Sequence, residues 1–172
     1  IAHNGEIYNF VELREILEKK GVKFTTDSDT EVLINAWRND GVDCLEGLDG
    51  MFAFAVWDGY QARIATDSFG EKPLFYAETP DGVLFSSEIA PLARLLNLNP
   101  SVTGENLAAY LALGFVPPPA TAYRAIRKVG PAALLTVRAG RIVDPRTYWT
   151  PPVGVPGRGA PRPLAKSDLD RV

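Results

Sequence analysis

The chain opens with the stretch Ile1-Ala2-His3-Asn4-Gly5-Glu6-Ile7-Tyr8-Asn9-Phe10, around which the rest of its sequence is organised. The stretch begins apolar, which is typical of the end of a buried strand, and then changes to Asn-Gly-Glu, which predicts a turn. We expect a helix after Asn9, because Asn9 and Glu12 have the spacing of a capping pair and apolar residues follow with a helical period. A polar turn after a strand can hold a small polar ligand.

The residues of this predicted turn have the chemistry of a binding site. Gly5 lets a ligand approach the backbone closely, and the Asn4 amide is a donor that can stabilise an oxyanion. Glu6 is a fixed acceptor for an ammonium or an amide N–H group. The alternative is a turn without a ligand, since Asn-Gly is a common turn dipeptide. These residues alone leave both interpretations open.

Composition limits the classes of protein that fit. The 172 residues suffice for one domain and a tail, and 46% hydrophobic with 23% charged residues is ordinary for a soluble globular protein. A net charge of −3 gives no sign of the basic surface that nucleic-acid-binding proteins carry. No apolar run approaches the roughly 20 residues that a membrane helix needs. The single cysteine, Cys44, permits no internal disulfide. We expect a cytoplasmic protein without nucleic-acid or membrane partners.

The rest of the sequence predicts helices and a β-meander. Helices are expected at residues 10–20, 29–39, 42–48 and 91–98 and after Thr103, and strands at 22–25, 51–57, 63–67, 73–77, 83–87, 136–138 and 141–143. Residues 51–57 are almost wholly apolar, which predicts a strand buried on both faces. Tight turns imply antiparallel pairing, so this order predicts an α+β fold. In the helix capped by Thr103, the residues expected to face inward are Leu107, Ala108, Tyr110 and Leu111.

Asp29 lies in the first turn of the second predicted helix, between Ser28 and Glu31, which form a predicted capping box. One interpretation is that its carboxylate complements the helix dipole. The other is that it lies beside the Asn-Gly-Glu segment and binds the α-amino group of an amino acid. Its position in the sequence is compatible with both.

Several runs of the sequence resemble class II glutamine amidotransferases, the N-terminal-nucleophile (Ntn) class, and more narrowly the asparagine synthetases. These runs are His3–Phe10, Ser28–Glu31, Gly50–Asp58, Asp67–Tyr76 and Phe85–Ile89. The resemblance spans about residues 1–149 and is strongest up to Ile89. One departure is Thr66, where the family commonly has an arginine before the aspartate.

The resemblance implies an α+β fold, the four-layer αββα Ntn-hydrolase sandwich with antiparallel sheets. Because the chain starts with Ile1 in the middle of a predicted strand, we expect the first strands to be missing. The glutaminase domain, incomplete at its N-terminus, is expected at residues 1–90. Its end and a connector are expected at 91–149. A Pro/Gly-rich linker and the start of a synthetase domain are expected at 150–172.

The resemblance also implies roles for individual residues. Asn4 and Gly5 would form the oxyanion hole, and Asn4, Glu6 and Asp29 would bind L-glutamine. The family's nucleophile is a cysteine at the mature N-terminus, whose free α-amine assists proton transfer. Ile1 cannot act in this way. Cys44 and His3 are interpreted as structural, so we expect the chain alone to be inactive and to hold no metal.

The implied full activity is that of an asparagine synthase (glutamine-hydrolysing), a ligase that amidates aspartate with ammonia drawn from glutamine. ATP and Mg²⁺ would bind in a downstream synthetase domain, the expected partner in cis, since this sequence has no pyrophosphate-binding loop. One alternative is a non-catalytic binding or regulatory module with the same fold. Another is an amidotransferase acting on a different carboxylate, such as a cell-wall or exopolysaccharide precursor. A homodimer is also left open.

Overall fold

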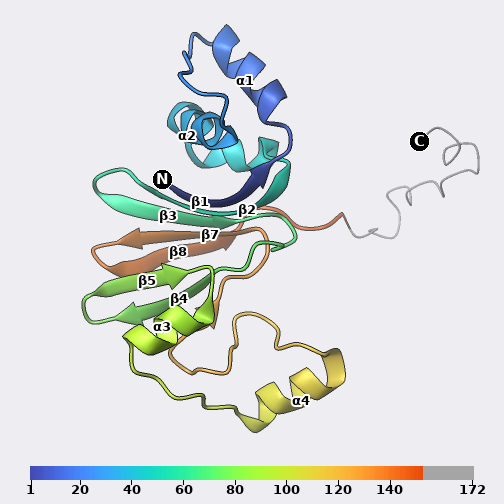
Figure 1. Cartoon of the computed structure of the whole chain (residues 1–172), viewed down its shortest axis with the longest axis vertical. Helices are drawn as coiled ribbons and strands as arrows, with labels where there is room; N and C mark the ends of the chain where they lie inside the picture. The colour runs from blue at the N-terminus through green and yellow to red at the C-terminus, as the bar shows by residue number, and fades with distance from the viewer. Residues whose placement is uncertain (153–172) are drawn as a thin grey trace, which may run out of the picture.

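Two antiparallel sheets form the centre of the computed structural model, which describes residues 1–152 (Figure 1). The larger sheet has five strands in the order β1 (Ala2–Ile7), β2 (Gly50–Trp57), β3 (Gln61–Thr66), β7 (Ala133–Arg138) and β8 (Arg141–Thr147). The smaller sheet has three strands in the order β5 (Gly82–Ser86), β4 (Phe75–Thr79) and β6 (Arg127–Lys128). Every pairing is antiparallel, as the tight turns predict.

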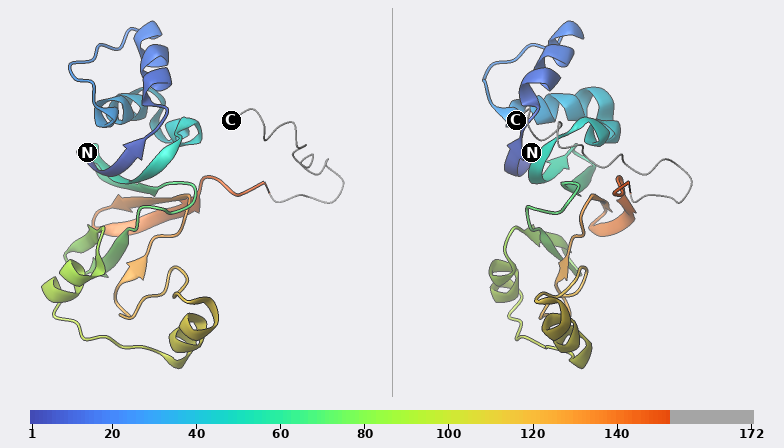
Figure 2. Two further views of the ribbon diagram at one scale, coloured as in Figure 1. Left: turned by 45° about the vertical axis from the view of Figure 1, so that its right-hand side comes forward. Right: turned by 90° about the vertical axis from the view of Figure 1, so that its right-hand side faces the viewer.

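Helices cover the outer faces of both sheets. On the five-stranded sheet lie α2 (Asp29–Asp40) and the 3₁₀ helix η1 (Gly41–Gly47), and α1 (Phe10–Lys19) packs against α2. On the three-stranded sheet lies α3 (Ile89–Leu95), whereas α4 (Gly104–Leu113) lies apart from both sheets (Figures 1 and 2). The order of layers is helix, sheet, sheet, helix, which confirms the predicted α+β sandwich. Within residues 1–152, no helix combines the length and apolarity that a membrane crossing requires.

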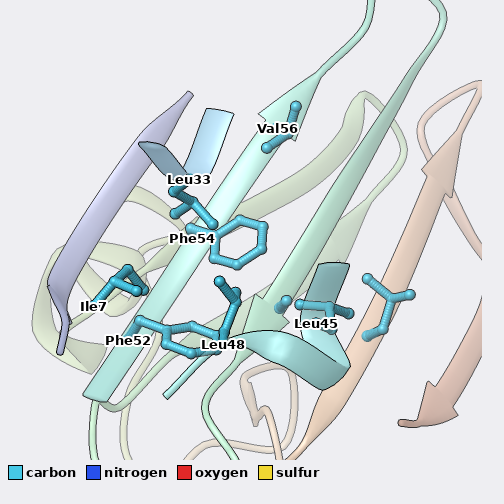
Figure 3. Packing of buried hydrophobic residues seen from close by; sticks show 9 residues of the cluster. Ile7, Leu33, Leu45, Leu48, Phe52, Phe54 and Val56 are labelled. Atoms are coloured by element: carbon cyan, nitrogen blue, oxygen red, sulfur yellow. The ribbon is translucent and has the colours of Figure 1, made fainter. Parts of the chain in front are cut away.

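Strand β2 separates two hydrophobic cores, because alternate side chains point to opposite faces of a sheet. Its large residues Phe52, Phe54 and Val56 pack under the helices with Ile7 and Leu33 (Figure 3). On its other face, Ala53 and Ala55 pack between the two sheets, together with Ile64, Leu74 and Val137. All five of these β2 residues are buried, so the prediction of a strand buried on both faces is confirmed.

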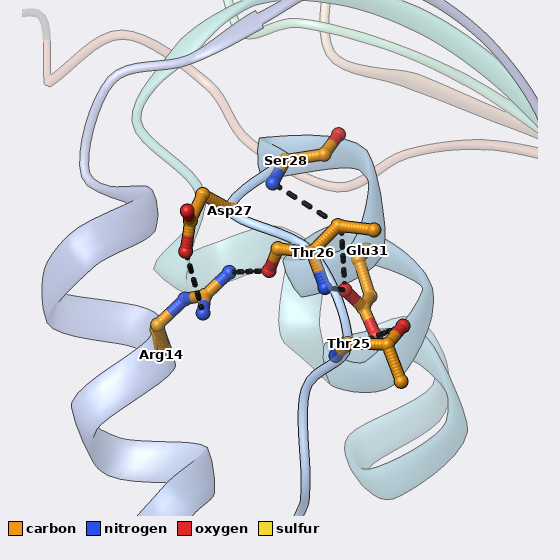
Figure 4. A network of polar contacts seen from close by, with 6 residues as sticks. All are labelled: Arg14, Thr25, Thr26, Asp27, Ser28 and Glu31. Atoms are coloured by element: carbon orange, nitrogen blue, oxygen red, sulfur yellow. Dashed lines mark hydrogen bonds and ion pairs between the residues drawn. The ribbon is translucent and has the colours of Figure 1, made fainter.

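The segment 22–25 was expected to be a strand, and the structure shows irregular backbone there. The carboxylate of Glu31 accepts hydrogen bonds from the backbone N–H and hydroxyl groups of Thr25 and Thr26, at 2.6–2.9 Å (Figure 4). The predicted capping box is therefore only half correct. Ser28 caps α2 by accepting from Thr30 N at 3.1 Å, but Glu31 holds the preceding loop instead of the cap residue.

Two further local predictions are wrong. Asn9 occupies the N-cap position of α1 but makes no capping hydrogen bond, because its side chain is bonded elsewhere. Asn9 Oδ1 accepts from Asp49 N at 3.0 Å, and Asn9 Nδ2 donates to Gly47 O at 2.9 Å. In α4, no residue is buried, although four were expected to face inward. The cap of α4 is as predicted, since Thr103 Oγ1 accepts from Asn106 N at 3.2 Å. The linker and synthetase start expected at 150–172 lie outside the described residues from 153 onward.

Candidate functional site

Asn4, Gly5 and Glu6 lie inside strand β1 and not in a turn, which corrects the sequence-based expectation. They pair with Ala53, Phe52 and Met51 of β2, and the chain turns only at residues 8–9. Gly5 has φ +145°, and a Cβ added there would lie 2.0 Å from the Met51 carbonyl oxygen. Its lack of a side chain therefore serves a close approach of two backbones. An Asn-Gly pair usually marks a turn, but here the partner strand overrides that local preference.

Strand β1 is an edge strand, and no other strand within residues 1–152 pairs with its outer side. Tyr8 N donates to Asp49 O at 2.7 Å across the β1–β2 ladder, whereas Ile7 N donates to Asp29 Oδ2 at 3.0 Å. Backbone groups of an antiparallel strand alternate in direction, so the N–H of Gly5 points the same way as that of Ile7. The open edge of β1 thus presents Gly5 N–H as a donor, two residues before the amide that bonds Asp29.

Asp29 begins α2, and both of its carboxylate oxygens are held in place. Oδ2 accepts from Ile7 N, and Oδ1 accepts from the Thr30 hydroxyl at 3.2 Å. The Thr30 oxygen also lies 3.0 Å from His3 Nδ1. Because the hydroxyl has one proton and the charged carboxylate is the stronger acceptor, we assign the proton of this second contact to His3 Nδ1.

The environment of His3 supports a neutral imidazole. Its Nε2 atom is buried and has no hydrogen-bond partner among the described residues. Burial lowers the pKa of His3, and the negative charge of Asp29 only partly opposes this. His3, Thr30 and Asp29 therefore form a chain of hydrogen bonds that orients the Asp29 carboxylate. Neither His3 nor Thr30 was singled out for this role from the sequence, because their proximity depends on how α2 packs on β1.

Asn4 and Glu6 are exposed and point to the side of β1 opposite His3 and Ile7, since their positions alternate along the strand. Asn4 Nδ2 donates to Ser87 Oγ at 3.0 Å, which joins β1 to the end of β5. Asn4 and Ser87 line a small cavity of about 180 Å³, and neither Glu6 nor Asp29 lines it. The predicted site residues therefore do not surround this cavity together. The structure does not bring the three side chains into contact. Asp29 lies on the helix side of β1, where it accepts from Ile7 N, and Asn4 and Glu6 lie on the opposite side of the strand.

A second cavity, of about 670 Å³, lies beyond the end of β1. Tyr8 and the acidic residues Glu46, Asp49 and Glu71 contribute to its lining. Partial desolvation, followed by the negative charges of Glu71 and Glu6, raises the pKa of Tyr8. Glu6 and Glu71 therefore act on the same region, and their negative potential favours a cationic group near the end of the strand.

Asp67 organises the loop that carries Glu71. It is only 1% exposed, and its carboxylate accepts backbone hydrogen bonds of 2.9–3.2 Å from Phe52, Phe69, Glu71 and Lys72. These four donors satisfy the buried charge within the backbone, so the arginine common in the family before this aspartate is not needed for that purpose. Its replacement, Thr66, instead donates to Gly130 O at 2.7 Å.

Cys44 does not belong to the site. It is buried in η1 and packs with Leu17, Val32 and Ala36. Burial, and then the charges of Asp40 and Asp43, raises its pKa to about 12, so its thiol is not ionised near neutral pH. Within residues 1–152, no group of three or more His, Cys, Asp or Glu side chains could hold a metal ion.

The edge of β1 therefore combines an exposed amide, an open backbone donor and an oriented carboxylate on an αββα sandwich. A family model described as "Glutamine amidotransferase domain" matches residues 1–149. The chain belongs to this family of glutamine amidotransferase domains.

The curated relatives found are more specific. Asparagine synthetase [glutamine-hydrolyzing] 1 of Bacillus subtilis is 41% identical over 151 residues, which are 87% of this chain and 24% of that protein. A putative asparagine synthetase of Mycobacterium tuberculosis H37Rv is 35% identical over 88% of this chain and 24% of its own length. The chain is thus a homologue of asparagine synthetases and spans about a quarter of these relatives' length.

A solved structure supports the fold independently. It is a glutamine phosphoribosylpyrophosphate amidotransferase from Bacillus subtilis, complexed with ADP and GMP. The match has a TM-score of 0.59 and 24% identity, and it covers 86% of this chain and 28% of that one. At this identity the likeness concerns the fold, and it agrees with the predicted Ntn-hydrolase sandwich.

Proposed function

We propose that this chain is the glutamine-binding part of an asparagine synthetase-like amidotransferase, which hydrolyses glutamine and supplies ammonia for the ATP-dependent amidation of aspartate. The observation that carries this proposal is the open edge of β1, where the Asp29 carboxylate accepts from Ile7 N and the Gly5 N–H group, two residues earlier, points the same way. The names of the relatives support the choice of aspartate as acceptor over another carboxylate.

In the proposed complex, L-glutamine lies along the edge of β1. Its α-ammonium binds the Asp29 carboxylate, whose oxygens keep lone pairs free after accepting from Ile7 and Thr30. Glu6 adds negative charge from the other side of the strand. The glutamine side-chain amide points toward Asn4, which retains a second Nδ2 proton beyond the one given to Ser87. Asn4 Nδ2 and Gly5 N–H then stabilise the oxyanion that forms during hydrolysis.

The nucleophile of this reaction is proposed to lie outside the 172 residues. The only cysteine of the chain is buried, has a raised pKa and lies in η1, so it cannot serve. We infer that the 172-residue chain by itself does not release ammonia from glutamine. ATP and Mg²⁺ are assigned to a synthetase domain in the remainder of a longer protein, because the relatives extend well beyond the matched region.

The test is Asp29→Asn in the full-length protein, with glutamine-dependent and ammonia-dependent synthesis measured side by side. Loss of a charge-assisted hydrogen bond is expected to raise the KM for glutamine about 30-fold and to leave ammonia-dependent synthesis unchanged. Asp27→Asn is the matched control. Its side chain is fully exposed and pairs only with Arg14 among the described residues, at 3.5 Å, so both activities are expected to stay intact. An equal loss of both activities with Asp29→Asn contradicts the proposed role.

A further inference from the structure

One side-chain hydrogen bond connects the candidate site to the second sheet. Asn4, in the edge strand of the five-stranded sheet, donates from Nδ2 to Ser87 Oγ at 3.0 Å. Ser87 follows the last residue of β5, in the three-stranded sheet, and lies 83 positions away along the chain. Within residues 1–152, the Asn4 side chain makes no other hydrogen bond. Ser87 is therefore the hydrogen-bonding partner that orients this amide.

Packing around Asn4 does not fix the orientation of its amide. The residue opposite Asn4 on β2 is Ala53, and the next residue on the same face is Ala55, so β2 offers only methyl groups there. A cavity of about 180 Å³ lies beside them, and Asn4, both alanines and Ser87 contribute to its lining. The last torsion of an asparagine side chain is also broad, because it lacks sharp staggered minima. An amide beside a cavity needs a hydrogen bond to keep one orientation.

The backbone around Ser87 is held on both sides, which makes its hydroxyl group a fixed anchor. Ser86, the preceding residue, belongs to the last pair of the β4–β5 ladder. Ser86 Oγ also accepts from Glu88 N at 3.2 Å, and α3 begins at the next residue. The Ser87 hydroxyl therefore accepts from Asn4 with little further loss of conformational freedom.

We propose that Ser87 is a positioning residue for Asn4, the proposed oxyanion donor. This inference rests on the proposed function, which assigns Asn4 Nδ2 and Gly5 N–H to the oxyanion. An amide nitrogen carries two protons in one plane, so giving one proton to Ser87 fixes the direction of the other. The bond is present without glutamine, so the donor needs no reorganisation when the negative charge develops. Ser87 itself does not touch the substrate and acts through Asn4.

Ser87→Ala in the full-length protein tests this role. Loss of one orienting hydrogen bond is expected to lower kcat for glutamine hydrolysis about tenfold. The KM for glutamine is expected to stay within about twofold, because an oxyanion donor acts on the transition state and Asp29 binds the ammonium group. Ammonia-dependent synthesis stays unchanged and reports that the variant is folded. An unchanged kcat, or a KM that rises as much as kcat falls, contradicts the proposal.

Two control variants separate the hydroxyl group from packing. Ser87→Thr keeps the hydroxyl and is expected to retain the kcat of the unsubstituted protein. Ser86→Ala removes the neighbouring hydroxyl, which lines the same cavity and accepts from Glu88 N, and it is expected to leave kcat unchanged. A fall in Ser87→Thr or in Ser86→Ala as large as in Ser87→Ala means that packing at this corner is responsible, and this overturns the proposal.

A double substitution tests whether Ser87 acts through Asn4. Asn4→Ala removes the donor itself and is expected to lower kcat about 100-fold or more. In that background, Ser87→Ala is expected to cause no further fall, because no donor is left to orient. A further fall of about tenfold means that Ser87 acts independently of Asn4, which rules out the positioning role.

The Nδ2 proton resonances of Asn4 supply a readout that does not depend on activity. In protein labelled with ¹⁵N at asparagine, the Asn4→Ala variant identifies these resonances. Ser87→Ala is expected to move them toward the shifts of a solvent-exposed asparagine, whereas Ser86→Ala leaves them in place. If they move while kcat is unchanged, Ser87 orients Asn4 but Asn4 is not the oxyanion donor, so the proposed function fails. If kcat falls while they stay in place, the positioning role fails and the proposed function is not affected.

Discussion

Helices α2 and α4 both have a capping residue at the N-terminus, but α2 is packed against the rest of the domain and α4 is exposed. Each begins with a side-chain cap, from Ser28 in α2 and Thr103 in α4. Helix α2 buries Val32, Leu33 and Ala36 against the sandwich, whereas α4 buries nothing within residues 1–152. Capping and composition start a helix, but they do not say which part of the protein covers it. The following predictions test how far this difference extends.

The largest expected effect concerns the core under α2. Leu33 is fully buried, so Leu33→Ala is expected to lower the free energy of unfolding of this domain by about 2–5 kcal/mol. Leu107→Ala in α4 removes a half-exposed side chain and is expected to cost less than about 1 kcal/mol in the same transition. Denaturant unfolding of the full-length protein, followed by the fluorescence of Trp37 beside Phe54, measures both. Equal costs mean that α4 belongs to the same cooperative core.

A smaller effect is expected from the hydrogen bond that orients Asp29, the residue of α2 that is proposed to bind glutamine. Thr30→Val removes the hydroxyl that holds Asp29 Oδ1 and is expected to raise the KM for glutamine about fivefold, as for one lost hydrogen bond. Thr30→Ser keeps the hydroxyl and is the matched control. Ammonia-dependent synthesis stays unchanged in both. If Thr30→Ser weakens glutamine use as much as Thr30→Val, packing of the methyl group explains the effect and the hydrogen bond does not.

The smallest effect is a pH dependence confined to the loop before α2. Hydrogen bonds from Thr26 and Thr25 lower the pKa of Glu31 to about 2, below its ordinary value of 4.5. A carboxylate with a lowered pKa contributes stability that is present above pH 4.5 and is lost as the pH falls through about 2. The amide resonances of Thr25 and Thr26 are expected to titrate with this midpoint. A midpoint near 4.5 contradicts the network. The same titration of these amides in Glu31→Gln, which has no carboxylate, also contradicts it.

Much of the architecture could be predicted from local patterns. The apolar run at residues 51–57 correctly indicated a strand buried on both faces, and the short turns correctly indicated antiparallel pairing. The α+β class followed from the order of these elements. The motifs that resemble class II amidotransferases indicated the family, which the comparison over residues 1–149 confirmed. The individual roles of Asn4, Gly5, Glu6 and Asp29 stay predictions until substitutions test them.

These errors share one physical cause, which is that each segment is held by a partner outside the local pattern, from five or six residues away to about forty. Asn4-Gly5-Glu6 looks like a turn until β2 pairs with it, and its glycine then allows two backbones to approach. Residues 22–25 alternate like a strand, but Glu31 binds the neighbouring backbone groups and holds the segment as a loop. Asn9 has the spacing of a cap, but its side-chain amide hydrogen-bonds to Gly47 O and Asp49 N instead.

By itself, the sequence determined where most helices and strands form, because period, capping residues and turn residues act over a few positions. Only the tertiary structure decided that the candidate site is the open edge of a strand, where His3 and Thr30 orient Asp29. It also decided that α4 is left uncovered by its own domain. Both features depend on which surfaces meet after folding, and contacts between residues far apart in the chain leave no signal in local spacing.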